Sequence, residues 1–256
     1  MGYHANAYTL VIGTQVGLTD QLALVGSIGS EKTQLHGDDQ AEQIEGSAAV
    51  GGVGLNYANG PLELSGALDT AYGWYRSTRT VTIGDESGTA DAQPRQWQTG
   101  LHLHGGYSFA LSNTLYVKPF VDGHAIRVTD DAFTENGTSP FRLAVEGRTD
   151  TALLGETGVE FGAHLPMHSG AELHPFFSAA AEFNQDKAWT TTAHFADASS
   201  WPGFTVATAG PGTLARFTLG ADLIKSQHLS FSIAYQPEFG SGYSAQAGTA
   251  RVSYTF

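Results

Sequence analysis

Histidines and acidic residues recur at alternating positions in two successive segments of this chain. His102 and His104 are separated by one residue, and Asp122 and His124 have the same spacing in the next segment. In an extended strand, residues two apart point to the same face, so each pair would share one face of its strand. Side chains of these types could transfer protons, as in a protease, or hold a metal ion. The alternative is that the histidines only hydrogen-bond to neighbouring carboxylates.

A second group, Ser178 with His174 and Asp222, has the residue types of a hydrolase triad. Three polar residues on strand faces are expected by chance in a chain of this kind. No closely spaced motif of metal ligands accompanies them, and the glycine run at 51–54 lacks the lysine and the strand–helix context of a phosphate loop. The sequence therefore predicts no catalytic residue, no metal ligand and no cofactor.

The composition narrows the class of protein. Of the 256 residues only 14% are charged, against about 25% in a typical globular chain. Cysteine is absent, which excludes thiolate metal sites, a cysteine nucleophile and disulfide bonds. The formal net charge of −13 argues against nucleic acid as a partner, because phosphate binding needs a positive surface. No apolar run approaches the about 18 residues of a membrane helix, and the opening "MGYHANAY" does not have the pattern of a signal peptide.

Apolar and polar residues alternate along almost the whole chain, which is the pattern of β-strands. In segment 97–109, for example, Leu101 and Leu103 alternate with His102 and His104. The alternation predicts eleven strands, at 8–16, 22–28, 47–57, 62–74, 97–109, 115–127, 151–163, 172–184, 213–223, 229–236 and 244–256. The faces opposite the apolar residues carry charged and histidine side chains: Glu63, Asp69, His102, His104, Lys118, Asp122, His124, Glu156, Glu160, Glu172, Glu182, Arg216, Asp222 and Arg251.

Strand length and loop order favour a membrane barrel over a soluble sandwich. Several segments run 11 to 13 residues, whereas soluble strands favour about 5 or 6 and a spanning strand needs about 9 to 11. Aromatic residues lie near strand ends, as interfacial girdles require. Short connections near 18–21, 58–61, 110–114, 165–171 and 224–228 alternate with long ones near 32–46, 76–95, 129–149 and 185–211, and with a modest turn at 237–244. We predict an all-β transmembrane antiparallel barrel, with apolar faces toward lipid and the polar residues lining a wet lumen.

The predicted strand count is odd, although single-chain bacterial barrels have even numbers. We expect twelve strands in the complete barrel, with the first one missing before Met1 or within the opening eight residues. The alternative is an overlooked strand inside 185–211, where "FTVAT" has β character. One extra strand there would reverse the sidedness of every later connection, so the missing first strand is preferred.

The order of several short motifs resembles a known family. The runs "ELHPFFSAAAEFNQ", "ARFTLGADL", "LSFSIAYQPEFGSGY" and "RVSYTF", with "LYVKPF" at 115–120, are similar to the C-terminal translocator domain of type V autotransporters. Each motif is degenerate, while their order is specific and extends over residues of about 8 to 256. The resemblance implies that residues 1–256 form one translocator β-barrel, without its linker helix and passenger and possibly without its first strand.

The family resemblance implies a function and a set of partners. The barrel would lie among lipid and lipopolysaccharide in the outer membrane of a Gram-negative bacterium and carry its own N-terminal passenger to the surface, with a linker helix in the pore. Periplasmic chaperones would escort it, and the β-barrel assembly machinery would insert it by reading a C-terminal β-signal formed by Val252, Tyr254 and Phe256. Arg251 stands where that signal usually has glycine, so either the signal is weaker or Arg251 binds lumen carboxylates. A passive porin or adhesin barrel is the alternative function, and a barrel hydrolase is a third.

Overall fold

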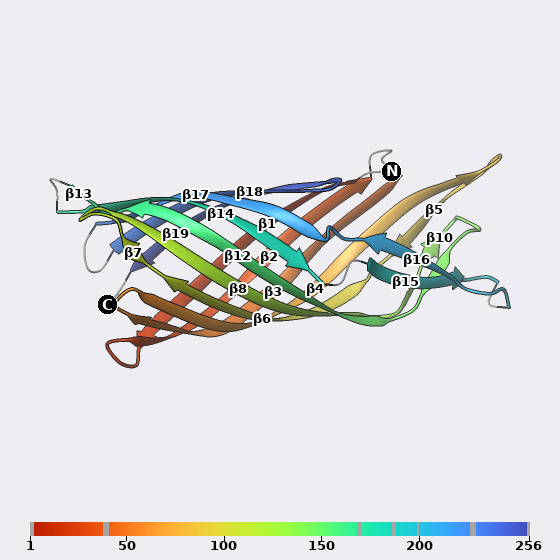
Figure 1. Ribbon diagram of the computed structural model, residues 1–256. Helices are drawn as coiled ribbons and strands as arrows, with labels where there is room; N and C mark the ends of the chain where they lie inside the picture. The colour runs from red at the N-terminus through yellow and green to blue at the C-terminus, as the bar shows by residue number, and fades with distance from the viewer. Residues whose placement is uncertain are drawn as a thin grey trace.

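One antiparallel sheet dominates the computed structural model, which describes residues 3–37, 41–167, 170–185, 188–198, 200–225 and 229–254 (Figure 1). Within these residues, eleven long strands follow one another in chain order and curl into an open barrel wall. They are β1 (Tyr3–Gly17), β2 (Leu22–Gly37), β3 (Glu42–Asn59), β4 (Leu62–Ile83), β6 (Arg95–Tyr107), β8 (Leu115–Asp130), β12 (Arg148–Ala163), β14 (Glu172–Asn184), β17 (Thr213–Ile224), β18 (Leu229–Gly240) and β19 (Tyr243–Tyr254). The predicted all-β class and each of the eleven predicted strands are confirmed.

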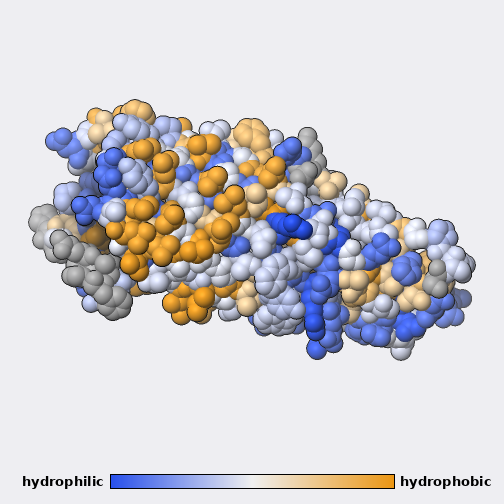
Figure 2. Space-filling model, turned by 90° about the horizontal axis from the view of Figure 1, so that it is seen from below, coloured by the Kyte–Doolittle hydropathy of each residue, from blue (hydrophilic) through white to orange (hydrophobic). Residues whose placement is uncertain are grey.

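Apolar side chains cover the outside of the wall. On β4, Leu64 and Leu68 point outward, and Leu68 is 58% exposed. Their cross-strand partners continue the same face, since Leu68 pairs with Val53 on β3 and with Leu101 on β6. Figure 2 shows hydrophobic residues gathered over the barrel, while hydrophilic residues are more frequent toward the long-loop end. A continuous apolar band of this extent needs an apolar surrounding, which a bilayer supplies.

Aromatic side chains mark the two borders of the apolar band. Toward one end of the barrel, Trp74 and Trp97 are both about half exposed, and the ring of Tyr72 lies 5.6 Å from that of Trp97. Toward the other end, the rings of Tyr107 and Phe109 lie 4.8 Å apart. Amphipathic aromatics at two levels are typical of barrel girdles at the membrane–water interfaces.

The connections differ strongly between the two ends of the barrel. At the short-turn end, β1 and β2 are joined by residues 18–21, and β3 and β4 by residues 60–61. The two-residue strands β7 (Phe109–Ala110) and β13 (Leu165–Pro166) also lie at this end. Successive connections alternate between this end and the opposite, long-loop end. The predicted sorting into short and long connections is therefore confirmed in outline.

Most segments predicted as long loops are partly strand, because the strands continue past the apolar band. The prediction of loops there is wrong. β2 and β3 remain paired up to His36 and Gln43, inside the predicted loop 32–46. β4 runs on to Ile83 and forms a hairpin with β5 (Glu86–Ala92), inside the predicted loop 76–95. The predicted turn 237–244 shrinks to residues 241–242, where Gly242 has the left-handed φ of 70° that favours glycine.

A second, smaller sheet stands at the long-loop end (Figure 1). It consists of β9 (Phe133–Thr134), β11 (Leu143–Val145), β15 (Ala188–Phe195) and β16 (Phe204–Ala209), while β10 (Asn136–Gly137) pairs with β5. The β character of "FTVAT" is therefore real. It belongs to a hairpin of two strands, β15 and β16. Because a hairpin begins and ends on the same side, the chain re-enters the wall at the long-loop end, and the later short and long connections keep their ends of the barrel.

The two edges of the large sheet are β1 and β19. Within the described residues each pairs on one side only, β1 with β2 and β19 with β18. Both run from the long-loop end to the short-turn end, because antiparallel pairing over eleven strands gives the first and last strands the same direction. The twelve-strand count stays a prediction. In the described ranges, no helix has the length and apolarity needed to cross a membrane.

The outward face gives a first prediction, which compares two positions on the same face of β4. Leu68→Arg should lower the free energy of unfolding by about 2–4 kcal/mol, because it places a charge near the bilayer midplane. Thr80→Arg should cost about 0–1 kcal/mol, since Thr80 lies beyond Trp74 and outside the apolar band. Denaturant unfolding of the barrel in lipid vesicles, followed by tryptophan fluorescence, measures both. Equal costs would contradict the lipid-facing assignment.

Candidate functional site

The inner face of the wall carries an arginine surrounded by carboxylates. Arg216 on β17 forms ion pairs with Glu156 on β12, Glu182 on β14 and Glu238 on β18, the last at 2.8 Å. The side chain of Arg216 is 19% exposed and that of Glu156 only 6%. The five N–H donors of a guanidinium can serve several acceptors at once, so one residue forms ion pairs with carboxylates on three strands. Glu156, Glu182, Glu238 and Arg216 thus share one face of the wall.

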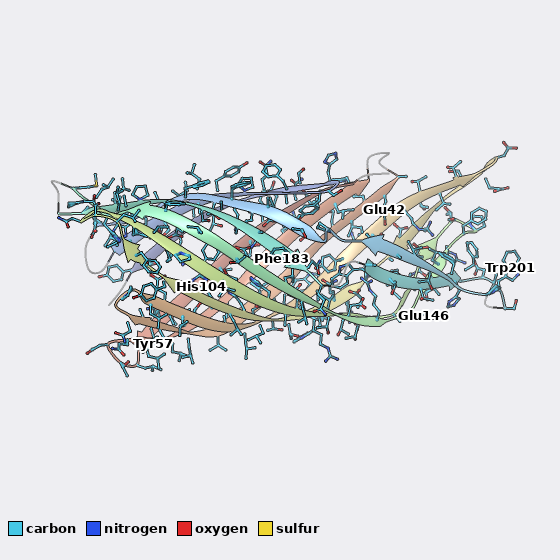
Figure 3. All side chains as sticks on the ribbon, viewed as in Figure 1. Glu42, Tyr57, His104, Glu146, Phe183 and Trp201 are labelled. Atoms are coloured by element: carbon cyan, nitrogen blue, oxygen red, sulfur yellow. The ribbon has the colours of Figure 1, made fainter. Side chains whose placement is uncertain are left out.

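His102, His104 and His124 also converge on the inward face of the wall. Asp122 Oδ1 on β8 lies 3.0 Å from His102 Nε2 and 2.9 Å from His104 Nδ1, both on β6. The rings of His102 and His124 stack with their centres 4.2 Å apart. Figure 3 shows His104 on the barrel wall. His102 and His104 thus share the carboxylate of Asp122 while His124 stacks on His102, and this arrangement agrees with the hydrogen-bonding alternative.

Lys118 on β8 connects two further carboxylates. Its Nζ lies 3.1 Å from Glu63 Oε2 on β4 and 3.1 Å from Glu160 Oε1 on β12. The hydroxyl of Tyr116 donates a hydrogen bond of 2.9 Å to the same oxygen of Glu160. Glu63, Lys118 and Glu160 therefore share one face of the wall, again with a cation between two anions.

A third polar group lies at the short-turn mouth of the lumen. His174 Nε2 lies 2.9 Å from Glu172 Oε1, both on β14, and 3.0 Å from His164 Nδ1. His164 follows β12 directly and was missed by sequence reasoning. The signal was present, because position 164 continues the even-numbered inward face of Glu156 and Glu160 by one more step. Glu238 was missed as well. Both residues lie just past the end of a predicted strand: His164 follows the strand predicted to end at 163, and Glu238 follows the one predicted to end at 236.

The remaining predicted lumen residues also lie on inward faces. The carboxylate of Asp69 lies so close to Gly100 that a Cβ there would overlap it. Asp222 pairs across the strands with His174 and with Ser232, which pairs with Arg251. In the part of the chain that the structure describes, no carboxylate lies within ion-pair distance of Arg251. Of the two alternatives for Arg251, a weaker signal or a contact with lumen carboxylates, these residues show no instance of the second.

The hydrolase triad is not assembled. Ser178 pairs with Glu160 and Thr218, whereas His174 pairs with Asp222. Four residues of extended strand separate Ser178 from His174, which corresponds to about 13 Å at about 3.3 Å per residue. A serine this far from the histidine cannot pass its proton to it directly.

Inward aromatic rings lie flat against the wall. Tyr75 on β4 pairs with Gly46 on β3, and a Cβ at Gly46 would overlap the Tyr75 ring. The rings of Tyr116 and Phe120 cover Gly162 and Gly158 on β12 in the same way. Glycine is required at these positions because only a residue without a side chain admits the ring.

Above the apolar band, an arginine–glutamate pair joins the wall to the segment that carries the small sheet. Arg79, five residues beyond Trp74 on β4, donates hydrogen bonds of 2.6 Å to each carboxylate oxygen of Glu135 and one of 2.8 Å to the carbonyl of Phe141. Glu135 is 6% exposed and also accepts the backbone N–H of Leu143. The hydrogen bond to Glu135 raises the pKa of Arg79 above its usual value, so the guanidinium stays charged.

Comparison with protein families identifies the barrel. The family model described as "Autotransporter beta-domain" matches residues 1–236. The chain belongs to the autotransporter β-domain family. This autotransporter barrel therefore lies in the outer membrane of a Gram-negative bacterium and translocates a passenger. The resemblance seen in the sequence motifs is confirmed.

Solved structures of autotransporter barrels share the fold. The translocator domain of autotransporter NalP from Neisseria meningitidis superposes with a TM-score of 0.78 at 16% identity, covering 99% of this chain and 82% of that one. The β-domain of the Bordetella autotransporter BrkA gives 0.68 at 17%, covering 99% and 92%. The transport unit of AIDA-I from Escherichia coli gives 0.54 at 13%, covering 99% and 84%. Comparison with curated proteins gives no match.

The arginine cluster of this autotransporter barrel gives a second prediction. Arg216→Met should lower the free energy of unfolding by about 2–3 kcal/mol, because it leaves Glu156 and Glu182 facing each other unneutralised. This is less than the about 3–5 kcal/mol of a fully buried pair, since the lumen is wet. Arg142→Met is the matched control, because its partner Asp197 is 59% exposed, and it should cost less than about 1 kcal/mol.

Denaturant unfolding in detergent micelles measures both variants. Adding Glu156→Gln and Glu182→Gln to Arg216→Met should recover most of the loss, because it removes the uncompensated charges. A loss unchanged by these substitutions would show that Arg216 acts through packing alone.

Proposed function

We propose that the lumen accommodates one extended or helical segment of the passenger chain at a time and hydrates it without binding it firmly. The observation that carries the proposal is the pairing of the lumen cations with carboxylates of the wall. Arg216 lies among three carboxylates and Lys118 between two, so neither cation is free to bind an acidic group of a passing peptide. The lining keeps an excess of carboxylates, and it offers water and dipoles to the peptide backbone.

The proposal includes a twelfth strand that closes the barrel. β1 and β19 run in the same direction, so they cannot pair antiparallel with each other. One strand that runs from the short-turn end to the long-loop end would be antiparallel to both. Closure would satisfy the unpaired backbone groups of both edges, which lipid cannot do. The linker helix and the passenger belong to the same proposal.

We also propose that the last strand carries the signal for insertion. Val252 and Tyr254 on β19 point outward from an edge strand and are 67% and 62% exposed, while Phe256 lies outside the described residues. An apolar edge strand can pair with another edge, as recognition by the assembly machinery would require. Delivery by periplasmic chaperones is part of this route. Autotransporter barrels are transport proteins, and we propose no catalytic role for the lumen histidines.

A surface-display experiment tests translocation. The chain, preceded by a signal peptide, a reporter passenger, a linker and one strand, is produced in a Gram-negative host. Protease added to intact cells should cleave the reporter while the folded barrel persists. A reporter that stays protected, in cells whose outer membrane has become permeable to small solutes, would favour the passive-pore alternative.

The insertion signal gives a third prediction, again with a matched control. Tyr254→Ser should lower the amount of folded barrel in the outer membrane several-fold, because it weakens recognition of the last strand. Phe161→Ser removes another outward aromatic, 53% exposed on β12, and should lower it much less. Heat-modifiable migration of outer-membrane fractions on gels counts the folded barrel. Equal losses would assign Tyr254 to the lipid interface only.

A further inference from the structure

Three lone-pair-bearing atoms converge at the short-turn mouth, from His164, Glu172 and His174. His174 Nε2 lies 2.9 Å from Glu172 Oε1 and 3.0 Å from His164 Nδ1, and His164 Nδ1 lies 3.5 Å from the same carboxylate oxygen. The atoms form a nearly equilateral triangle. With both histidines neutral, each ring has one N–H to donate, so hydrogen bonds account for at most two of the three contacts.

The size of the triangle fits one face of a metal coordination sphere. With bonds of about 2.0–2.1 Å to nitrogen and oxygen, two ligands of a tetrahedral Zn²⁺ lie about 3.3–3.4 Å apart, and two adjacent ligands of an octahedral ion about 2.9 Å apart. The three observed distances span this range. A cation above the triangle would accept a lone pair from every atom at once.

The orientation of the histidine rings supports the same reading. A ring nitrogen lone pair lies in the plane of its ring, so two rings can aim at one ion only if their planes intersect there. The planes of His164 and His174 are 81° apart. The lumen group of His102, Asp122 and His124 also brings three possible ligands together. However, its two rings are stacked at 13°, and nearly parallel planes direct the lone pairs past a common ion.

The surrounding elements hold the three residues in place and leave room for an ion. Glu172 and His174 share the inward face of β14, and β13 pairs with the start of that strand. The ring of Tyr116 lies 5.2 Å from that of His164. The side chains of His164 and Glu172 are 49% and 43% exposed, so an ion can reach them from solution and keep water in its remaining positions. Three protein ligands with an open position are common at Zn²⁺ sites.

We propose that His164, Glu172 and His174 form a binding site for a divalent transition-metal ion of the Zn²⁺ type at the short-turn mouth of the barrel. The bound ion joins the end of β12 to the start of β14 across the connection between them. It therefore stabilises the folded barrel by an amount that rises with the free metal concentration, because it binds the folded chain and not the unfolded one. The argument for this site does not depend on the proposed passage of the passenger, and the sequence prediction of no metal ligand does not hold under this proposal.

Titration with ZnCl₂ of the full chain, folded in detergent micelles and freed of metal by a chelator, tests the proposal. Calorimetry should show one Zn²⁺ bound per chain. His174→Ala and Glu172→Gln should each weaken binding about tenfold or more, since even partners that only orient a ligand contribute about 10–100-fold. His102→Ala is the control and should leave the affinity unchanged. Circular dichroism checks that each variant is folded.

Two further measurements separate the site from general histidine binding. Co²⁺ in place of Zn²⁺ should give visible absorption bands that disappear in His164→Ala. Lowering the pH from 7 to 5 should release the ion, because the histidine ligands must be unprotonated. The proposal is overturned if the folded wild-type chain binds no Zn²⁺, or if His174→Ala and Glu172→Gln bind it as tightly as the wild type. It is equally overturned if His102→Ala, and not His174→Ala, removes the bound ion.

Discussion

Hydrocarbon offers no partner to a backbone N–H or C=O group, so a strand that crosses it must be hydrogen-bonded along both sides. The ladder between β1 and β2 answers this requirement, with unbroken pairing from Tyr3–Gly37 to Gly17–Ala23. The same constraint explains why neighbouring strands are joined by such short connections at one end. The same constraint applies to β1 and β19, because among the described strands each has a paired neighbour on one side only.

Alternation along each strand lets one chain face two solvents. Outward positions between the two aromatic borders contribute to an apolar band, and inward positions lie beside inward positions of the next strand. Charges placed on alternate residues therefore meet charges of the neighbouring strands without any turn or loop to position them. Arg216 and Lys118 reach carboxylates on several strands in this way. The lumen is thus polar, and its cations are held by carboxylates of the wall, which suits a passage for polypeptide.

Most of the fold could be predicted from the sequence because period-2 alternation is a local property. The lumen residues followed from it directly, as His104 and Asp122 show. The ends of the strands could not be predicted, because pairing beyond the membrane no longer requires apolar outward residues, and Thr80 and Thr82 on β4 break the pattern while the ladder continues. Contacts between strands that are distant in sequence were equally hidden. The pairing of Arg79 with Glu135 depends on how the long-loop end folds back, and the meeting of His164 with His174 depends on the path of the connection between β12 and β14.

The recessed tyrosine at Gly46 has a consequence for the width of the channel. An aromatic ring that stood upright on the inner wall would reach several ångströms toward the axis and narrow the bore. Laid over a glycine of the adjacent strand, the ring of Tyr75 becomes part of the wall's thickness, and the rings of Tyr116 and Phe120 do the same lower down. Bulky residues can therefore pack against the inside of the barrel and stabilise it. The lumen stays as wide as one lined by small side chains.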